Sequence, residues 1–531
     1  MGGVLQIASD QSLGAAGTAL NIDGGTLRLG GDVTTNRTVI LGAFNNYAGL
    51  DLNGHTGTLK GSIVGPGQKL EVWGNRDNPS VLNINGNNTY TGDTYFKGSF
   101  NDASFPTKTT INANSDTPFG ASSSDAHGGT VFVGNATLNV NNHATLGYHS
   151  IINDGGTINL NSADTNGHAD INNRGGYGIN AVLNVNNASS VGASTITNNN
   201  GGIINLNDSS RADAATIKNN GGAINAVGGS GVGSLSGNGG GTISLKGTFT
   251  VGALNQDDML DSVIQNDSSK NAGSLVKVGT GTQTLTGSNS YTGSTNINEG
   301  TLALAGQGSI AQSASIDIEQ QGSFDISKAA SDETVNTISG SGSVILGKNT
   351  LNIVNANYIK PYFGSISGSG GVNLFRGGVF FSGQNTYTGL TDVKGGDFHL
   401  DGSIAGDLLN ETTTKIGDQP QGKVSVGGDI KNLGALTIRN ATIHNISSDA
   451  GASTFLGNVV AEGDISSKSD FVFGDTNKDK DNDVTAFSYN PGKGNRTTLN
   501  GNLILTQAHG AINGWVLGGC WVNHCWGDGS S

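Results

Sequence analysis

The residues with the clearest metal-binding chemistry stand in one acidic stretch, GDTNKDKDNDVT at 474–485. Carboxylate and amide side chains occupy its alternate positions, namely Asp475, Asn477, Asp479, Asp481 and Asp483. This spacing resembles a calcium loop, which also needs a glycine at its sixth position and a glutamate at its twelfth. Lys480 and Ala486 stand there instead. The pattern therefore favours a mobile charged loop, with weak Ca²⁺ binding as the alternative, and predicts no other cofactor.

The only two cysteines, Cys520 and Cys525, lie in the tryptophan-rich segment GGCWVNHCWGDG. They predict either a local disulfide or two free thiols. With His524 they would offer three zinc ligands, one fewer than a structural zinc site requires. All preceding residues lack cysteine, which suits a chain that crosses an oxidising compartment unfolded. We interpret residues 511–531 as a tail of different character, either a cap on the fold or out-of-frame sequence.

Acidic residues also cluster in the middle of the chain. Asp257, Asp258 and Asp261 are close in sequence, and Asp317 and Glu319 alternate. Two carboxylates about 5–9 Å apart can serve as acid and base in glycoside cleavage. Solvated loops and strand faces explain the same residues without chemistry. A carbohydrate-active enzyme, a polysaccharide lyase or hydrolase, is therefore kept only as the alternative function.

Other catalytic patterns are missing from the sequence. It contains no phosphate-binding Gly-x-x-x-x-Gly-Lys-Ser/Thr loop, no Gly-x-Ser-x-Gly elbow and no His-Glu-x-x-His. The segment HADINNR brings His168, Asp170 and Arg174 together, as solvated turn residues would be. We therefore assign no catalytic residue.

Composition excludes further classes of function. Of 531 residues 87 are glycine, only 13% are charged, and the net charge is −14. Such a chain has no basic surface with which to bind nucleic acid. No apolar run approaches the ~20 residues of a membrane-spanning helix. The first residues, MGGVLQIASD, lack the basic and apolar parts of a signal peptide.

Short strands are the main elements that the sequence predicts. Runs such as GGTINLN (155–161) and AVLNVNN (181–187) place aliphatic residues two apart and end in glycine or asparagine. Period two puts the aliphatic side chains on one face of a strand and the polar side chains on the other. An all-β chain follows. Only 257–266 and 327–338 predict a short helical turn each.

The spacing of these runs predicts a solenoid. Paired glycines begin at positions 155, 175, 201, 221 and 240, in steps of 20, 26, 20 and 19 residues. Such a period is typical of three short strands and three turns wound into one coil. We therefore expect a parallel β-helix with roughly 20–25 residues per coil. Its asparagines should form hydrogen-bonded ladders from coil to coil.

One motif recurs at long intervals. The pattern Asn-x-Tyr-Thr-Gly-x-Thr occurs at 88–94, 289–295 and 385–391, and segments such as TISGSG (337–342) and SISGSG (365–370) share a second signature. A catalytic site is normally written once, whereas a structural unit can repeat. The segments near 61–98, 273–304 and 363–400 closely resemble the autotransporter-associated β-strand repeat, found in passenger domains of type V secretion proteins of Gram-negative bacteria. The motif residues to which we assign the structural role are Tyr90, Gly92, Tyr291, Gly293, Tyr387 and Gly389.

The resemblance implies a right-handed parallel β-helix over residues 1–510, with the motif tyrosines packed over neighbouring coils. It also implies an exported protein at the cell surface or released from it, in contact with host or bacterial surface proteins or glycans. Relatives normally carry an N-terminal signal peptide and a C-terminal outer-membrane β-barrel. We expect neither in this chain, which we interpret as a passenger fragment, a truncated product or a protein exported otherwise. The expected role is structural and adhesive.

Overall fold

The structure is a computed structural model of the chain, and its description covers part of the sequence. The described residues are 3–42, 47–66, 69–98, 108–123, 125–161, 168–176, 178–187, 189–207, 210–268, 270–357, 360–419, 422–468, 471–474, 488–489, 497–499 and 503–506. They fall into two compact units, an N-terminal unit, Met1–Gly293, and a C-terminal unit, Ser294–Ser531. Each unit is described by itself.

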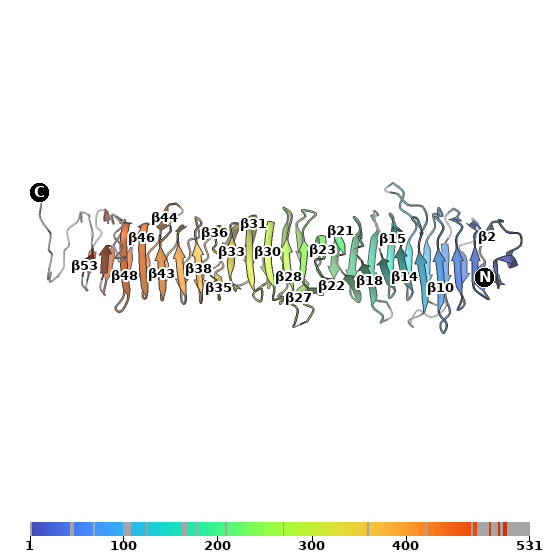
Figure 1. Ribbon diagram of the computed structural model, residues 1–531, viewed down its shortest axis with the longest axis horizontal. Helices are drawn as coiled ribbons and strands as arrows, with labels where there is room; N and C mark the ends of the chain where they lie inside the picture. Colours follow the sequence, from blue (N-terminus) through green and yellow to red (C-terminus); the bar gives the residue numbers. More distant parts are fainter. Residues whose placement is uncertain are drawn as a thin grey trace. The chain divides into compact units, whose positions relative to one another are not determined.

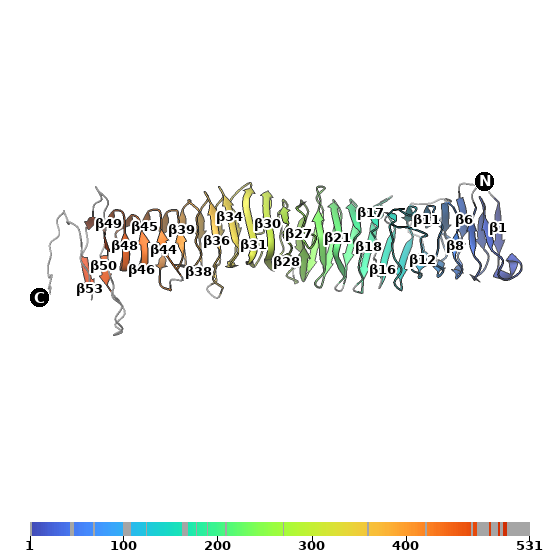
Figure 2. The same cartoon turned by 90° about the horizontal axis from the view of Figure 1, so that it is seen from above.

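Parallel strands stacked coil upon coil build the N-terminal unit, as the blue to green strands of Figures 1 and 2 show. The register aligns Leu138 with Ile158, Ile158 with Leu183, Leu183 with Ile204, and Ile204 with Ile224. One coil therefore takes 20, 25, 21 and 20 residues in turn, which confirms the predicted parallel solenoid and its period of about 21 residues. Its right-handedness stays a prediction.

Two principal sheets run through this unit. The first, here called the long sheet, contains β1 (Val4–Ile7), β3 (Thr26–Leu29), β6 (Tyr47–Asp51), β9 (Lys69–Trp73), β11 (Thr94–Lys97), β13 (Val131–Gly134), β15 (Ser150–Asp154), β17 (Asp170–Arg174), β19 (Thr195–Asn199), β21 (Arg211–Asn220), β23 (Gly231–Ser236), β25 (Thr248–Val251), β26 (Asp258–Leu260), β28 (Ser274–Lys277) and β29 (Thr282–Leu285). The second, the 11-stranded sheet, contains β4 (Val33–Thr35), β7 (Thr56–Leu59), β10 (Ser80–Ile84), β12 (Thr109–Ala113), β14 (Thr137–Asn141), β16 (Thr157–Asn161), β18 (Ala181–Asn186), β20 (Gly202–Leu206), β22 (Ala223–Val227), β24 (Thr242–Lys246) and β27 (Val263–Asn266). A short third sheet contains β2 (Leu20–Ile22), β5 (Val39–Leu41) and β8 (Ile63–Val64).

Parallel sheets also build the C-terminal unit, whose strands follow one another in coil order in Figure 2. One sheet contains β30 (Ser294–Gly306), β31 (Ser315–Ala329), β33 (Ile338–Gly340), β34 (Ser343–Gly347) and β36 (Ser365–Gly368). The nine-stranded sheet contains β32 (Glu333–Val335), β35 (Leu351–Ile353), β37 (Val372–Leu374), β39 (Thr391–Val393), β42 (Leu408–Asn410), β45 (Ile430–Asn432), β47 (Ile446–Ser448), β49 (Ile465–Ser467) and β52 (Thr497–Leu499). The ten-stranded sheet contains β38 (Gly378–Phe381), β40 (Asp397–Leu400), β41 (Ser403–Ile404), β43 (Thr413–Ile416), β44 (Val424–Val426), β46 (Ala435–Ile443), β48 (Ser453–Ala461), β50 (Phe471–Gly474), β51 (Ser488–Tyr489) and β53 (Leu503–Thr506).

Coils of the C-terminal unit vary in length. Val372 aligns with Thr391, Thr391 with Leu408, and Leu408 with Ile430, which are steps of 19, 17 and 22 residues. The paired strands of this sheet keep three residues each, so the difference lies in the rest of each coil. Some coils are therefore shorter than the predicted 20–25 residues.

Alternation along each strand puts the core inside the coils. In β16 the side chains of Ile158 and Leu160 have no exposed area, whereas Asn159 between them is half-buried and faces outward. Each rung of inward aliphatic side chains covers the rung before it, so apolar burial is shared between neighbouring coils. The core is therefore a continuous column within each unit.

The two predicted helical turns are wrong. Segment 257–266 forms β26 and β27, which pair with β29 and β24. Segment 327–338 continues β31 and then forms β32, which pairs with β35. The reason is tertiary: neighbouring coils offer these backbones ladder hydrogen bonds, and pairing overrides a weak local helical preference.

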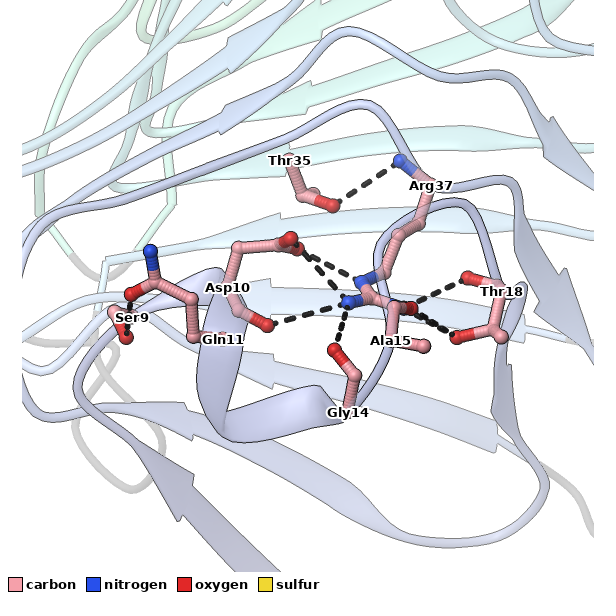
Figure 3. Close-up of polar contacts among 8 residues, drawn as sticks. All are labelled: Ser9, Asp10, Gln11, Gly14, Ala15, Thr18, Thr35 and Arg37. Atoms are coloured by element: carbon pink, nitrogen blue, oxygen red, sulfur yellow. Dashed lines mark hydrogen bonds and ion pairs between the residues drawn. The ribbon is translucent and has the colours of Figure 1, made fainter.

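A buried arginine organises the start of the N-terminal unit (Figure 3). Arg37 is 3% exposed, and its Nε donates to Asp10 Oδ1 at 2.8 Å. Its other nitrogens donate to backbone oxygens of Gly14 at 2.9 Å and Ala15 at 2.8 Å, and to both oxygens of Thr18. The guanidinium thus holds the 3₁₀ helix η1 (Asp10–Leu13) and the loop that follows it in place through hydrogen bonds. This helix is the one helix in the described part of the chain.

Candidate functional site

Several predicted site residues lie outside the residues that the structure describes. They are the calcium candidates Asp475, Asn477, Asp479, Asp481 and Asp483 and the cysteines Cys520 and Cys525. Weak Ca²⁺ binding and the disulfide therefore stay predictions. Within the ranges that the structure does describe, no three His, Cys, Asp or Glu side chains come close enough together to hold a metal ion.

The central carboxylates hold the backbone of neighbouring coils. Asp258 is 9% exposed and accepts from Ser234 Oγ at 2.9 Å and from the Leu235 amide at 3.0 Å. Asp257 accepts from the Thr282 amide at 2.7 Å, and Asp261 accepts from the Gly240 amide at 2.9 Å. Each carboxylate thus takes a backbone donor from an adjacent coil. This arrangement stabilises the stack.

Asp317, Arg174 and His168 also take part in contacts between coils. Asp317 lies 3.4 Å from Lys360 Nζ, and the Arg174 side chain lies 3.4 Å from Asp154 one coil earlier. The exposed ring of His168 stacks on Tyr148 with centroids 4.8 Å apart. His168 and Arg174, neighbours in sequence, therefore have different partners.

The repeated motif places one asparagine as a bridge to the preceding coil. Asn88 accepts from the Ile63 amide at 2.7 Å, and Asn385 accepts from the Ile366 amide at 2.9 Å. Asn289 repeats the contact, since it accepts from the backbone amide of Ile264 at 2.9 Å.

All three of these asparagines are at most 4% exposed. A buried amide that bonds backbone on another coil satisfies polar groups that the turn would otherwise leave without partners. The motif predicts a structural role for its tyrosine and glycine but does not by itself single out these asparagines. Their fixed position two residues before each tyrosine is the signal that could identify them.

The motif tyrosines lie inside the turns. Tyr90, Tyr291 and Tyr387 are each at most 1% exposed. The hydroxyls of Tyr90 and Tyr387 lie 2.6 Å from Thr94 Oγ1 and Thr391 Oγ1, the threonines that end the motif. Burial raises the pKa of both phenols, so they stay neutral hydrogen-bonding groups. All three rings are therefore core side chains, and the hydroxyls of Tyr90 and Tyr387 have an internal polar partner.

The motif glycines mark close approaches between coils. A Cβ on Gly293 would lie 2.4 Å from Gly273 O, and one on Gly389 would lie 2.3 Å from Gly370 O. Gly92 occupies the other side of such a contact, since a Cβ on Gly129 would lie 2.1 Å from Gly92 O. Real Cβ atoms do not come this close to a backbone oxygen, so larger residues would force the coils apart.

Two ladders of asparagines run along the outer surface of the 11-stranded sheet, within the part from β10 to β22. In the first ladder, the side-chain Nδ2 of one asparagine donates to the Oδ1 of the asparagine one coil earlier, at 2.6–2.8 Å. Its members in chain order are Asn83, Asn112, Asn139, Asn159, Asn184, Asn205 and Asn225. In the second, two positions further along each strand, the distances are 2.9–3.1 Å, through Asn85, Asn114, Asn141, Asn161, Asn186 and Asn207. These residues are here called the asparagine face. The predicted ladders are confirmed.

A third ladder runs inside the unit. Its members, which have no exposed area, are Asn153, Asn173, Asn198 and Asn219. The Nδ2 of each of the first three donates to the Oδ1 of the asparagine one coil later at 2.8 Å, and Asn219 Nδ2 donates to Ser262 Oγ. Each Nδ2 also donates to a backbone oxygen, as Asn198 does to Ala223 O at 3.1 Å. A simple alternation of polar and apolar residues assigns no asparagine to the core, so the sequence did not indicate this ladder.

The comparisons with known proteins point to one family of repeats. Residues 79–99, 275–304 and 369–397 match the passenger-associated-transport-repeat family model. Each of the three matches is confined to one segment of the chain. Together with the parallel β-solenoid they are consistent with an autotransporter passenger domain, which confirms the resemblance inferred from the tyrosine motif. No curated protein and no solved structure matches the chain.

Each matched segment contains one tyrosine motif, so the family signature coincides with the bridging asparagine and the buried ring. Within the residues described, no helix has the length and apolar character needed to cross a membrane.

Proposed function

We propose that this chain is a surface-exposed or secreted passenger with a structural and adhesive role towards host or neighbouring cells. The observation that carries the proposal is the placement of three transport repeats within coils of a parallel solenoid. Stacked coils give each unit an outer surface on which paired strands recur while the side chains and the lengths of the coils vary. Such a surface suits the presentation of binding residues.

Charge supports an extracellular contact role. The net charge of −14 opposes nonspecific adherence to the anionic surface of the bacterium itself. The proposed contact regions are the segments 99–128 and 470–496. Residues 108–123 and 125–128 of the first are described and include β12, whereas most of the second lies outside the described residues. Adhesion that depends on these segments would mark them as the receptor-binding parts.

Protease treatment of intact bacteria tests the location. Cells that express the full-length gene should lose the passenger to added protease while a cytoplasmic marker survives. Cells broken before treatment are the control for protease sensitivity. A passenger that resists protease on intact cells but not after breakage would contradict the proposal.

An adhesion assay tests the role. Bacteria with the gene should bind to host cells or to one another more than bacteria from which it is deleted, and purified chain should compete. Equal binding by both strains, with the passenger displayed at the surface, would refute adhesion and leave surface location intact.

A further inference from the structure

The asparagine face forms a regular two-dimensional array. Neighbouring rungs of a sheet lie ~4.8 Å apart, and residues two apart on a strand lie ~6.6 Å apart. The register is unbroken from β10 to β20, so its amides repeat at these two spacings over six coils. A surface with such spacing favours a ligand that itself repeats in one direction.

Polar capacity remains on this face. An asparagine side chain has two donor hydrogens and can accept two hydrogen bonds, and the ladder uses one of each. Asn139, Asn159 and Asn184 are half-buried, so part of each residue remains accessible to solvent. The ladder holds these amides in one orientation before any ligand arrives, which lowers the entropic cost of binding.

The face carries no charge. The stretches 80–85, 109–114, 137–141, 157–161, 181–186 and 202–207 contain no Asp, Glu, Lys or Arg. Charge first returns two rungs later, at Lys246, where the asparagines give way to Ser244. Neutrality over six coils gives no charged group to attract a nucleic acid, an acidic glycan or a charged protein patch.

We propose that the asparagine face binds an extended, uncharged β-linked glycan that lies along the stacking direction of the coils. One sugar of such a glycan advances by close to one rung spacing, so each sugar meets a new pair of asparagines. The separation of the two ladders is comparable with the width of a pyranose across its equatorial hydroxyls. Each amide pair can therefore bond hydroxyls on both edges of one ring. The inference rests on the proposed adhesive function, whose partner class it names.

Binding by the purified chain tests this inference without reference to surface display. Cellohexaose and chitohexaose, which are uncharged and β-1,4-linked, are titrated by calorimetry, with maltohexaose as a control of the same size but coiled shape. We expect both β-linked sugars to bind at least tenfold more tightly than maltohexaose. Because no ion pair takes part, affinity should not fall as salt rises.

Substitution locates the binding site. The double variant Asn159→Thr, Asn184→Thr keeps good strand formers but removes two adjacent amides, and should weaken binding about tenfold. Asn172→Thr is the matched control on β17 of the long sheet and should bind as the parent does. Should the double variant not fold, the single variant Asn159→Gln, which displaces one amide, should still weaken binding measurably.

Three results would overturn the inference: no binding of β-linked sugars, equal binding of maltohexaose, or unchanged affinity in the folded double variant. None of them bears on whether the passenger reaches the cell surface. The protease test decides that question separately.

Discussion

The bridging asparagine of the third repeat allows a sharp test of how coils are held together. Asn385 is 1% exposed and accepts from the Ile366 amide at 2.9 Å, while its Nδ2 donates to the oxygens of Gly383 and Ser403. Asn385→Ala leaves the Ile366 amide buried without that acceptor, at a cost of about 1–3 kcal/mol. Both oxygens keep a backbone donor. With lost packing, we expect a total of about 3 kcal/mol.

Asn373→Ala is the matched control in the same unit. Asn373 is half-buried on β37 and donates to Asn352 Oδ1 at 2.8 Å, where water can replace the lost bond. We expect this change to cost about 0.5 kcal/mol.

Stacked repeats need not unfold in one step, so local measurement is preferred to a single global transition. Native-state hydrogen exchange of the peptide that contains Ile366 should accelerate about a hundredfold in Asn385→Ala and little in Asn373→Ala. Equal effects of the two substitutions would refute the bridging role of Asn385.

Three further predictions concern other parts of the chain. Burial lowers the pKa of His149 in the folded protein, because the buried ring is more stable neutral than charged. The stability that the neutral ring contributes is therefore complete above the unfolded pKa of about 6.5 and is lost as pH falls through the lowered folded pKa. Melting temperature should therefore fall on acidification, and less so in His149→Gln. Gly389→Ala should destabilise by about 2 kcal/mol or more in denaturant melts, whereas Gly422→Ala, with no atom within 4 Å of the new Cβ, should be nearly neutral. Arg37→Lys cannot reproduce the forked set of donors and should cost about 2 kcal/mol, with faster proteolysis at residues 8–19.

The general fold could be predicted because its signals are local and repeat along the chain. The alternation of polar and apolar residues predicts that Ile158 and Leu160 face the core, as they do. The spacing of the paired glycines predicts the number of residues in a coil. The helical turns predicted at 257–266 and 327–338 were wrong because a short window contains no information about the neighbouring coil that supplies its hydrogen bonds.

The details between coils could be predicted only in part. Outward ladders followed from asparagines at alternate positions, whereas the inner ladder from Asn153 to Asn219 depends on which asparagine of each pair faces the core. The hydrogen bonds of the Arg37 guanidinium join residues 19 to 27 positions apart, a separation set by the loop and not by any periodicity. Such contacts depend on the packed structure and leave no regular trace in the sequence.

The fold depends on successive coils that align their strands in parallel and in register. Pyrene attached to the double variant Asn159→Cys, Asn184→Cys, with Cys520 and Cys525 replaced by serine, reads this register directly. Residues 159 and 184 are ladder partners, about 4.8 Å apart in a parallel sheet, so excimer fluorescence is expected. The pair Asn159→Cys, Asn172→Cys, on different sheets, should give monomer emission alone. Absence of the excimer in the first pair, or equal excimer in both, would contradict the parallel in-register solenoid.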